Sequence, residues 1–256
     1  MDGQNRTALK RILNQIINLR SFLQAFPRYI NFLKDLRKYS KMSGAEEIKF
    51  RNIYPIIYEK TKIQSHDPHY FFQDIWLFKR ILESKCEYHI DVGSKHAVIG
   101  LLSTITKVTY IELRPLKVNL ENFESKKGNI LSLPYENNSI KSLSSCHVAE
   151  HIGLGRYGDK LDPFGTKKAA KELTRVLAPE GNLYFSLPIG KPRLCFNGHR
   201  IHSTEQILRY FDGLELIELS GTDDKGKFIE NVDRNVLDQC LYGCGYFWFK
   251  KRKKTK

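Results

Sequence analysis

The stretch from residue 88 to residue 100, Tyr-His-Ile-Asp-Val-Gly-Ser-Lys-His-Ala-Val-Ile-Gly, constrains the fold more than any other part of the chain. Its first half is a short apolar run typical of a buried strand, and Asp91 and Gly93 follow where such a strand leaves a sheet. The apolar pattern of residues 97–102 then predicts a helix that packs back on the strand. A buried strand, a glycine turn and a helix N-terminus together indicate a site for a nucleotide-like ligand.

Length and composition allow one catalytic-sized domain with additional segments. With 256 residues, of which 41% are hydrophobic, the chain can bury one substantial core. The five cysteines are scattered and form no Cys-x-x-Cys pair, which disfavours a disulfide framework and favours a reducing, cytoplasmic setting. The apolar runs fall far short of the ~20 residues of a spanning helix, and the N-terminal sequence lacks a signal-peptide core.

The formal net charge of +14 is concentrated at the two ends of the chain. Residues 1–42 hold nine Lys and Arg against two acids, and residues 250–256 hold six against none. A protein that grips nucleic acid through its catalytic face is expected to carry the excess there, so nucleic acid is a disfavoured partner. Two basic ends instead suit a peripheral contact with an anionic surface on the inner face of a membrane, with a solvated tail as the equally good alternative.

The N-terminal region has apolar positions at helical spacing among Lys and Arg over residues 6–41, with a break predicted near Pro27. Such basic amphipathic helices can pack on a domain or lie on a bilayer, and packing is the commoner reason. Residues 66–69, His-Asp-Pro-His, are predicted to form a turn that enters a helix over residues 70–82 rather than a metal site. The chain is therefore divided into a helical extension (1–66), a central domain (67–249) and a basic tail (250–256).

Strands and helices alternate through the central domain, which predicts an α/β fold. Charge and amphipathic spacing indicate helices at residues 116–125 and 166–177. Ser203 and Gln206 have capping-box spacing, so another helix is expected to begin there. This alternation predicts a parallel sheet covered by helices on both faces. Further strands are predicted at residues 108–113, 140–145, 182–187, 214–219 and 244–250.

Glu112 stands at the end of the second predicted strand, beyond the glycine turn at Gly93. An acid at this place can accept hydrogen bonds from both hydroxyl groups of a ribose. A glutamate at a strand end is common, so Glu112 is evidence for a ribose site only together with the glycine turn that precedes it. The turn lacks the phosphate-cradling G-x-G-x-x-G pattern, which disfavours a Rossmann dehydrogenase.

Five features in this order resemble the class I S-adenosylmethionine-dependent methyltransferases over about residues 86–220. They are Asp-Val-Gly-Ser at 91–94, the acid at 112, Gly-Asn-Ile-Leu-Ser-Leu-Pro-Tyr at 128–135, Val-Ala-Glu-His-Ile at 148–152 and Glu-Leu-Thr-Arg-Val-Leu-Ala-Pro-Glu-Gly-Asn-Leu at 172–183. The chain is most similar to a poorly characterised branch, a domain of unknown function seen in nematodes and bacteria, whose members also carry Gly-Arg-Tyr-Gly-Asp and His-Arg-Ile-His-Ser. The resemblance implies a Rossmann-like methyltransferase fold with a mostly parallel seven-stranded sheet, helices on both faces and an antiparallel last strand.

The resemblance also implies S-adenosylmethionine as the cofactor. By this resemblance, Asp91, Gly93 and Ser94 form the turn that holds the cofactor, and Glu112 binds its ribose. The same resemblance places the adenine between Asn129 and Ile130 and the sulfonium near His147. Departures from the pattern are Lys95 in place of a second glycine, Asn129 in place of an aspartate, Lys141 in place of an acid and Glu180 in place of a glycine. A side chain at position 95 could narrow the cofactor turn, so a degenerate binding module without the cofactor is one alternative.

The loop from Gly153 to Gly165 follows the fourth strand at the carboxyl edge of the sheet, where open α/β folds bind ligands. A solvated glycine-rich loop is the plainer interpretation, but the loop is the best candidate for holding the substrate. Its predicted substrate-binding residues are Arg156, Tyr157, Lys160 and Asp162. The candidate bases for a hydroxyl acceptor are His199, which is favoured, and His202, Asp159 and His151.

Residues 147–151 also match the His-x-x-Glu-His pattern of a zinc protease, but they begin at a strand end and run into glycines instead of a stable helix. The cysteine between Gly243 and Gly245 is interpreted as tight packing. No metal site is predicted. The predicted function is O-methylation of a small-molecule or glycan-type acceptor, with an RNA methyltransferase as the enzymatic alternative.

Overall fold

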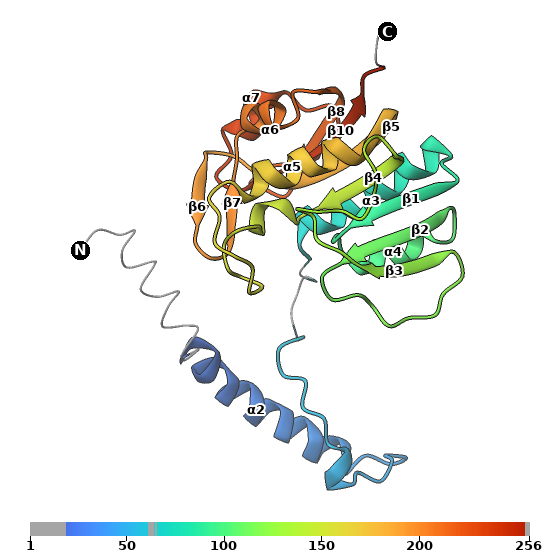
Figure 1. Cartoon of the computed structure of the whole chain (residues 1–256). Coiled ribbons are helices and arrows are strands. Elements are labelled where there is room, and N and C mark those ends of the chain that lie inside the picture. The colour runs from blue at the N-terminus through green and yellow to red at the C-terminus, as the bar shows by residue number, and fades with distance from the viewer. Residues whose placement is uncertain (1–18, 61–63, 65, 254–256) are drawn as a thin grey trace, which may run out of the picture. The chain divides into compact units, whose positions relative to one another are not determined.

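The computed structural model describes residues 19–60, 64 and 66–253. The chain divides into two compact units, Met1–Ser65 and His66–Lys256, and each is considered by itself (Figure 1). No helix of the described residues is long and apolar enough to cross a lipid bilayer. Part of the predicted basic ends, residues 1–18 and 254–256, lies outside the described residues, and contact with a membrane stays a prediction.

The N-terminal unit contains helix α2 (Leu19–Tyr39) and the short 3-10 helix η1 (Phe50–Asn52). The predicted break near Pro27 is wrong, because α2 continues through this proline. Proline removes one backbone N–H and crowds the preceding turn, so that it either kinks or breaks a helix, and a helix can continue where the freed carbonyl is open to water. Phe26 beside it is 72% exposed, so the helix surface is open there.

The second unit is built on an eight-stranded sheet with the order β3-β2-β1-β4-β5-β10-β8-β9. Strands β1 to β5 run parallel, and β10 lies antiparallel between β5 and β8. The prediction of a mostly parallel sheet with an antiparallel last strand is confirmed. The strands are β1 (Tyr88–Val92), β2 (Lys107–Glu112), β3 (Phe123–Lys127), β4 (Ile140–Cys146), β5 (Leu177–Ile189), β8 (Leu214–Thr222), β9 (Phe228–Ile229) and β10 (Gly243–Lys251), and β6 (Arg193–Cys195) pairs with β7 (His199–Ile201) as a separate hairpin.

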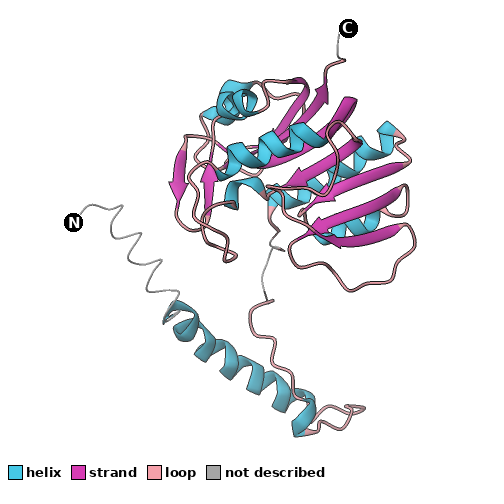
Figure 2. Cartoon of the chain, viewed as in Figure 1, coloured by secondary structure: helices cyan, strands magenta, loops and turns pink. Residues whose placement is uncertain are grey.

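Helices cover both faces of this sheet, as the alternating pattern predicts (Figure 2). One apolar cluster joins the sheet to α5, α6 and α7, and a second joins its other face to α3 and α4. Ser203 caps α6 through the predicted reciprocal capping box with Gln206. The helices are α3 (Pro68–Ser84), α4 (His96–Leu102), η2 (Ala149–His151), α5 (Gly165–Val176), α6 (Thr204–Tyr210) and α7 (Arg234–Asp238).

Three details of the predicted arrangement are wrong. Residues 116–125 do not form a helix, and Phe123 begins strand β3 instead. This strand pairs with β2 alone at the edge of the sheet, where charged side chains are normal and hide the apolar alternation of a strand. The sheet gains an eighth strand from the two residues of β9, which are too few to leave a pattern. Strand β10 also includes Lys250 and Lys251, the first residues of the predicted tail.

His89 is a buried histidine that links β1 to β4. Its two ring nitrogens each lie 2.8 Å from a serine hydroxyl, those of Ser142 and Ser144. The ring is fully buried, and burial lowers its pKa from 6.5 to about 3. The unfolded chain therefore binds a proton in this range that the folded chain does not, and stability that is present above about pH 6.5 is lost as the pH falls towards 3.

We expect His89→Gln to flatten this pH dependence, because glutamine does not titrate. Between pH 6 and pH 4, the wild-type free energy of unfolding should fall more steeply than that of the variant, by about 1.4 kcal/mol per pH unit. Urea unfolding at several pH values measures both slopes. His96→Gln, at an exposed position on α4, is the control and should keep the wild-type slope. Equal slopes for His89→Gln and wild type would contradict the prediction.

Candidate functional site

Two neighbouring cavities open at the carboxyl edge of the parallel strands. The glycine-turn cavity, of about 180 Å³, lies at the ends of β1, β2 and β3. The histidine cavity, of about 530 Å³, lies beside it and contains four histidines. Both cavities share the walls formed by Gly93, His147, His151 and Tyr157, so a ligand in one faces a ligand in the other.

The glycine turn after β1 is held by a buried carboxylate. Asp91 is fully buried and accepts hydrogen bonds from the backbone N–H of Ser94, from the Ser94 hydroxyl and from the Ser144 hydroxyl. Gly93 has a φ of +74°, in the left-handed region that favours glycine. A Cβ atom there would also lie 3.2 Å from the Val148 side chain, so glycine keeps the cavity open. Asp91 therefore shapes the turn, while the Gly93 backbone faces the cavity.

The far wall of the glycine-turn cavity is formed by residues that follow β2 and β3. Glu112 lines the cavity, and its Oε1 accepts a hydrogen bond of 2.7 Å from the backbone N–H of Leu113. Asn129 and Ile130 line it as well. The Asn129 side chain accepts a hydrogen bond from the Leu131 N–H, which fixes a tight turn, and Ile130 is 5% exposed. One acid, one amide and one apolar side chain are thus brought together as the sequence predicts.

Lys95 turns its side chain away from the glycine-turn cavity. Its Nζ lies 3.6 Å from the Asp74 carboxylate and 5.4 Å from the centre of the Tyr70 ring, both on α3. The residue lines the histidine cavity but not the glycine-turn cavity. A lysine at position 95, where the methyltransferase pattern has a second glycine, therefore does not obstruct the turn at Gly93.

His147 is the residue that connects the two cavities. Its backbone has a φ of +56°, a left-handed conformation that is uncommon for a residue with a side chain, and its N–H donates to the Ser186 carbonyl. Its Nδ1 lies 2.9 Å from Oε1 of Glu150, and its Nε2 lies 3.3 Å from Sγ of Cys244. Burial lowers the pKa of His147, but its contacts with Cys244 and Glu150 outweigh burial and raise it well above 6.5.

Glu150 is a fully buried carboxylate at the floor of the histidine cavity. Burial alone raises its pKa, and the hydrogen bond and charge of His147 reverse that effect and lower it, so the group is ionised. Within the described part of the chain, its Oε2 has no hydrogen-bond partner. A buried charge with one unsatisfied oxygen is costly, and this cost makes Glu150 a candidate functional residue.

His151 and His199 face each other across the histidine cavity. Their ring centres are 6.4 Å apart, and Nδ1 of His151 lies 2.6 Å from the Gly198 carbonyl oxygen. Burial lowers the pKa of His199 below 6.5, so this ring is neutral at pH 7 and can accept a proton. Arg156 and Tyr157 stand beside them, with the Arg156 guanidinium 5.2 Å from the Tyr157 ring centre. The structure brings these four predicted residues together.

The remaining residues of the predicted substrate loop are used within the loop or lie outside the cavities. Asp159 accepts from the backbone N–H groups of Gly153 and Tyr157, and these bonds outweigh burial and lower its pKa. The Asp162 carboxylate accepts from the Phe164 N–H and pairs with Lys168. Lys160 is exposed and lines neither cavity. The plainer interpretation of this segment is a solvated glycine-rich loop with aspartates as turn residues, and it describes the two aspartates well.

His202 lies behind the site, not in it. It is 4% exposed, its ring packs 5.9 Å from that of Tyr210, and burial lowers its pKa to about 4. It lines neither cavity, whereas His199 lines the histidine cavity. The preference for His199 over His202 as the base is therefore supported by position, while its role stays a prediction.

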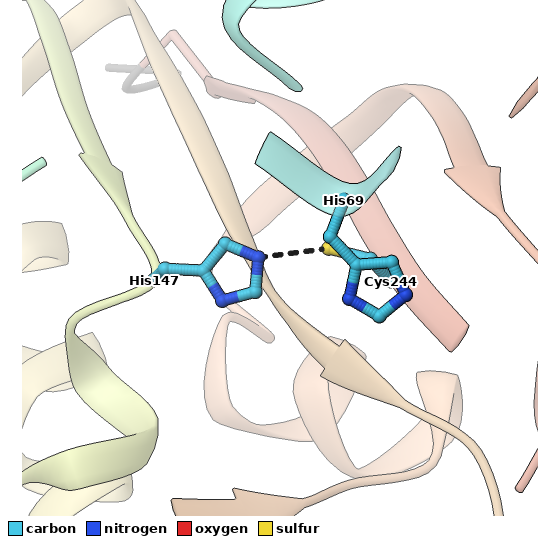
Figure 3. Close-up of side chains that lie close together, drawn as sticks. All are labelled: His69, His147 and Cys244. Atoms are coloured by element: carbon cyan, nitrogen blue, oxygen red, sulfur yellow. Dashed lines mark hydrogen bonds between the residues drawn. The ribbon is translucent and has the colours of Figure 1, made fainter. Parts of the chain in front are cut away.

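Several residues of the histidine cavity or its wall, Glu150 among them, were not predicted to belong to a site. His69 and Tyr242 line the cavity, and Cys244 lies against His147 (Figure 3). The helix entry predicted at residues 66–69 is correct, since Asp67 caps α3 and Pro68 occupies its first turn. That same entry places His69 at the cavity. The spacing of His69, His147 and Cys244 along the chain does not indicate a shared site, because the three residues come from separate elements.

Residues 96–239, more than half of the chain, match the family model described as "Caenorhabditis protein of unknown function, DUF268". The chain belongs to this DUF268 family. No curated protein matches it.

Solved structures show which fold this DUF268 protein shares. The N-methyltransferase NodS from Bradyrhizobium japonicum WM9, in complex with S-adenosyl-L-homocysteine, matches with a TM-score of 0.53 at 14% identity over 73% of this chain and 89% of NodS. The YcgJ protein from Bacillus subtilis matches with a TM-score of 0.51 at 14% identity over 72% of this chain and 99% of YcgJ. The [4+2]-cyclase SpnF matches with a TM-score of 0.50 at 14% identity over 69% of this chain and 80% of SpnF. The Rossmann-like methyltransferase fold is thereby established, while a cyclase among the matches shows that the fold does not decide the chemistry.

Proposed function

We propose that this DUF268 protein is a methyltransferase that uses S-adenosylmethionine. The observation that carries the proposal is the glycine-turn cavity, in which a left-handed glycine, a strand-end acid and an amide–apolar pair converge from the ends of β1, β2 and β3. The crystal structure of NodS, an N-methyltransferase of the same fold, contains S-adenosyl-L-homocysteine. Open α/β sheets bind their ligands at this edge.

The residues present fit such a cofactor. Gly93 allows the backbone to approach the amino-acid part, since a Cβ there would crowd Val148 at 3.2 Å. The Glu112 carboxylate can accept hydrogen bonds from two ribose hydroxyls, and Ile130 offers an apolar surface to the adenine. His147, at the boundary of the two cavities, would lie near the reacting end of the cofactor.

The histidine cavity is the proposed place of the methyl acceptor, and a hydroxyl oxygen is the proposed nucleophile. When bound, the cofactor supplies a methyl group already activated by a positive sulfur. The protein then has to orient the acceptor oxygen in line with that carbon and take its proton. His199 is the proposed base, because its ring is neutral at pH 7 and faces the cavity. As the cofactor's methyl group passes to the acceptor oxygen, His199 would take the proton that this oxygen loses.

A small-molecule or glycan-type acceptor agrees best with the walls of the histidine cavity. They combine cations such as Arg156 and Lys95 with acids such as Asp67 and Glu150, beside the aromatic Tyr157 and Tyr242. Such a mixture suits hydroxyls and a single anionic group better than an extended phosphate backbone, which favours an uninterrupted basic stripe. This contrast supports the small acceptor over RNA.

Calorimetric titration with S-adenosylhomocysteine tests the proposed cofactor directly. Saturable one-to-one binding is expected, with a dissociation constant of roughly micromolar order, which corresponds to about 8 kcal/mol of binding free energy. NADH serves as the control ligand and should give no binding heat, because the turn lacks a dinucleotide-binding pattern. Absence of heat with S-adenosylhomocysteine in a protein that melts cooperatively would reject the proposal and favour a binding module that has lost the cofactor.

A further inference from the structure

Three metal-ligating side chains from separate elements meet at the wall of the histidine cavity. They are His69 from the first turn of α3, His147 from the end of β4 and Cys244 from β10 (Figure 3). One donor atom from each lies within 4.8 Å of the others. The His147 Nε2 lies 3.3 Å from Sγ of Cys244, and the two imidazole rings are stacked with centres 6.2 Å apart.

The backbone holds each of these donors in place independently. Asp67 caps the helix that carries His69, and the Tyr246 hydroxyl donates to the His69 carbonyl at 3.0 Å. Cys244 is fully buried in a strand that is paired on both sides. His147 keeps a left-handed backbone that costs roughly 1–3 kcal/mol, as strained residues at functional sites often do. The cluster is therefore fixed by the fold before any ligand arrives.

The surroundings of His147 match those of a metal-bound histidine. Ligating histidines donate their second ring N–H to a carboxylate or carbonyl, which sets the tautomer and the ring orientation. Here Glu150 lies 2.9 Å from Nδ1, is fully buried, and leaves Nε2 directed at Cys244. A thiol–imidazole hydrogen bond alone would account for the contact at 3.3 Å, but it would give no role to the His69 ring or to the buried carboxylate.

We propose that His69, His147 and Cys244 bind one zinc ion whose fourth position opens into the histidine cavity. Two imidazole nitrogens and one thiolate form a donor set that zinc prefers, and three protein ligands with one open position are typical of a reactive zinc site. His69 and His147 both line the cavity, so the open position faces it. Ligands at about 2.1 and 2.3 Å in a tetrahedral site lie roughly 3.6 Å apart, so the widest pair closes by about 1 Å through rotation of one ring.

The role of this ion in the reaction rests on the proposed methyl transfer. A hydroxyl or thiol bound at the fourth position would lose its proton more readily, because zinc stabilises the anion. The proton would pass to His199 or to water, and the bound oxygen or sulfur would take the methyl group as the bond between that carbon and the cofactor's sulfur breaks and S-adenosylhomocysteine leaves. Zinc would thus select acceptors that carry a coordinating hydroxyl or thiol.

Cobalt(II) titration of the untagged, full-length protein, after treatment with a chelator, tests the site itself. One equivalent should give the intense visible bands of a tetrahedral ion and a near-ultraviolet sulfur-to-cobalt charge-transfer band, and zinc should displace the cobalt stoichiometrically. Cys244→Ser should abolish the charge-transfer band. Zinc affinity, measured by competition with a chelating dye, should fall about 10–100-fold in Glu150→Gln and further in His69→Gln.

Cys195→Ser and His96→Gln are the matched controls, because they remove a cysteine and a histidine outside the cluster and should keep the wild-type spectrum. Thermal unfolding confirms that each variant is folded. Failure of the wild type to bind cobalt, or a charge-transfer band that persists in Cys244→Ser, would overturn the proposal. Titration of the wild type with S-adenosylhomocysteine is a separate measurement that tests the cofactor alone. The zinc site and the cofactor can therefore be rejected independently of each other.

Discussion

Replacing Glu112 with alanine is expected to weaken binding of S-adenosylhomocysteine by about 100-fold. Each hydrogen bond to a charged group contributes roughly 1.5–3 kcal/mol, and a carboxylate that holds two ribose hydroxyls would lose both. A loss near 3 kcal/mol corresponds to about two powers of ten in the dissociation constant. Glu112 accepts one short hydrogen bond, of 2.7 Å from the neighbouring Leu113 N–H, and two long ones of 3.5 Å from the Arg114 N–H and the Tyr110 hydroxyl, so the fold should tolerate the change.

Calorimetric titration of Glu112→Ala measures this loss. Glu112→Gln keeps one acceptor oxygen, so its affinity for S-adenosylhomocysteine should lie between those of Glu112→Ala and the wild type. Glu121→Ala removes an exposed glutamate outside both cavities and should bind as the wild type does. An affinity of Glu112→Ala within a factor of three of the wild type would refute the ribose role of this residue.

Glu218→Ala is expected to lower the free energy of unfolding by about 3–5 kcal/mol, because it leaves a buried guanidinium without its closest partner. The Arg80 Nε donates to Glu218 at 2.6 Å, and the Trp76 indole donates to the same carboxylate at 2.8 Å. Ser220 donates to it as well, at 2.6 Å. The carboxylate thus joins α3 to β8, and its removal leaves three donors unsatisfied in the interior.

Urea unfolding measures this loss directly. Thermal unfolding should show it as a fall in melting temperature of roughly 10 °C. Glu215→Ala, on the same strand but exposed, is the control and should change the stability by less than about 0.5 kcal/mol. A Glu218→Ala protein within about 1 kcal/mol of the wild type would show that Glu83 and Glu230, the other partners of Arg80, hold the guanidinium by themselves.

Much of the fold could be predicted because its signals are local. The apolar run before Gly93 and the amphipathic spacing of residues 166–177 gave β1 and α5, and the capping pair at Ser203 gave α6. Strand β3 could not be found in this way. Its exposed charged residues are tolerated at a sheet edge, so pairing with β2 creates the strand and the sequence pattern does not.

The glycine-turn cavity was predictable for a topological reason. The carboxyl ends of parallel strands meet at one edge, so residues that follow successive strands must lie near one another. Gly93 and Glu112 were therefore placed together by the order of strands and turns, whereas Asn129 was placed by the resemblance to the methyltransferases, because strand β3 was not predicted. Side chains within an irregular loop follow no such rule. Asp159 was a candidate base, but its carboxylate is bonded to backbone N–H groups of its own loop.

The sequence by itself determined the alternating α/β architecture and the residues at the strand ends, because periodicity and turn chemistry act over short stretches of chain, and the family followed from its resemblance to known methyltransferases. Only the tertiary structure decided that His69, His147 and Cys244 share one cavity wall, and that His199 faces this cavity while His202 is buried behind it. The reason is physical. These contacts depend on how α3, β4 and β10 pack across the sheet and on the left-handed backbone of His147, and neither is encoded in the spacing of residues along the chain.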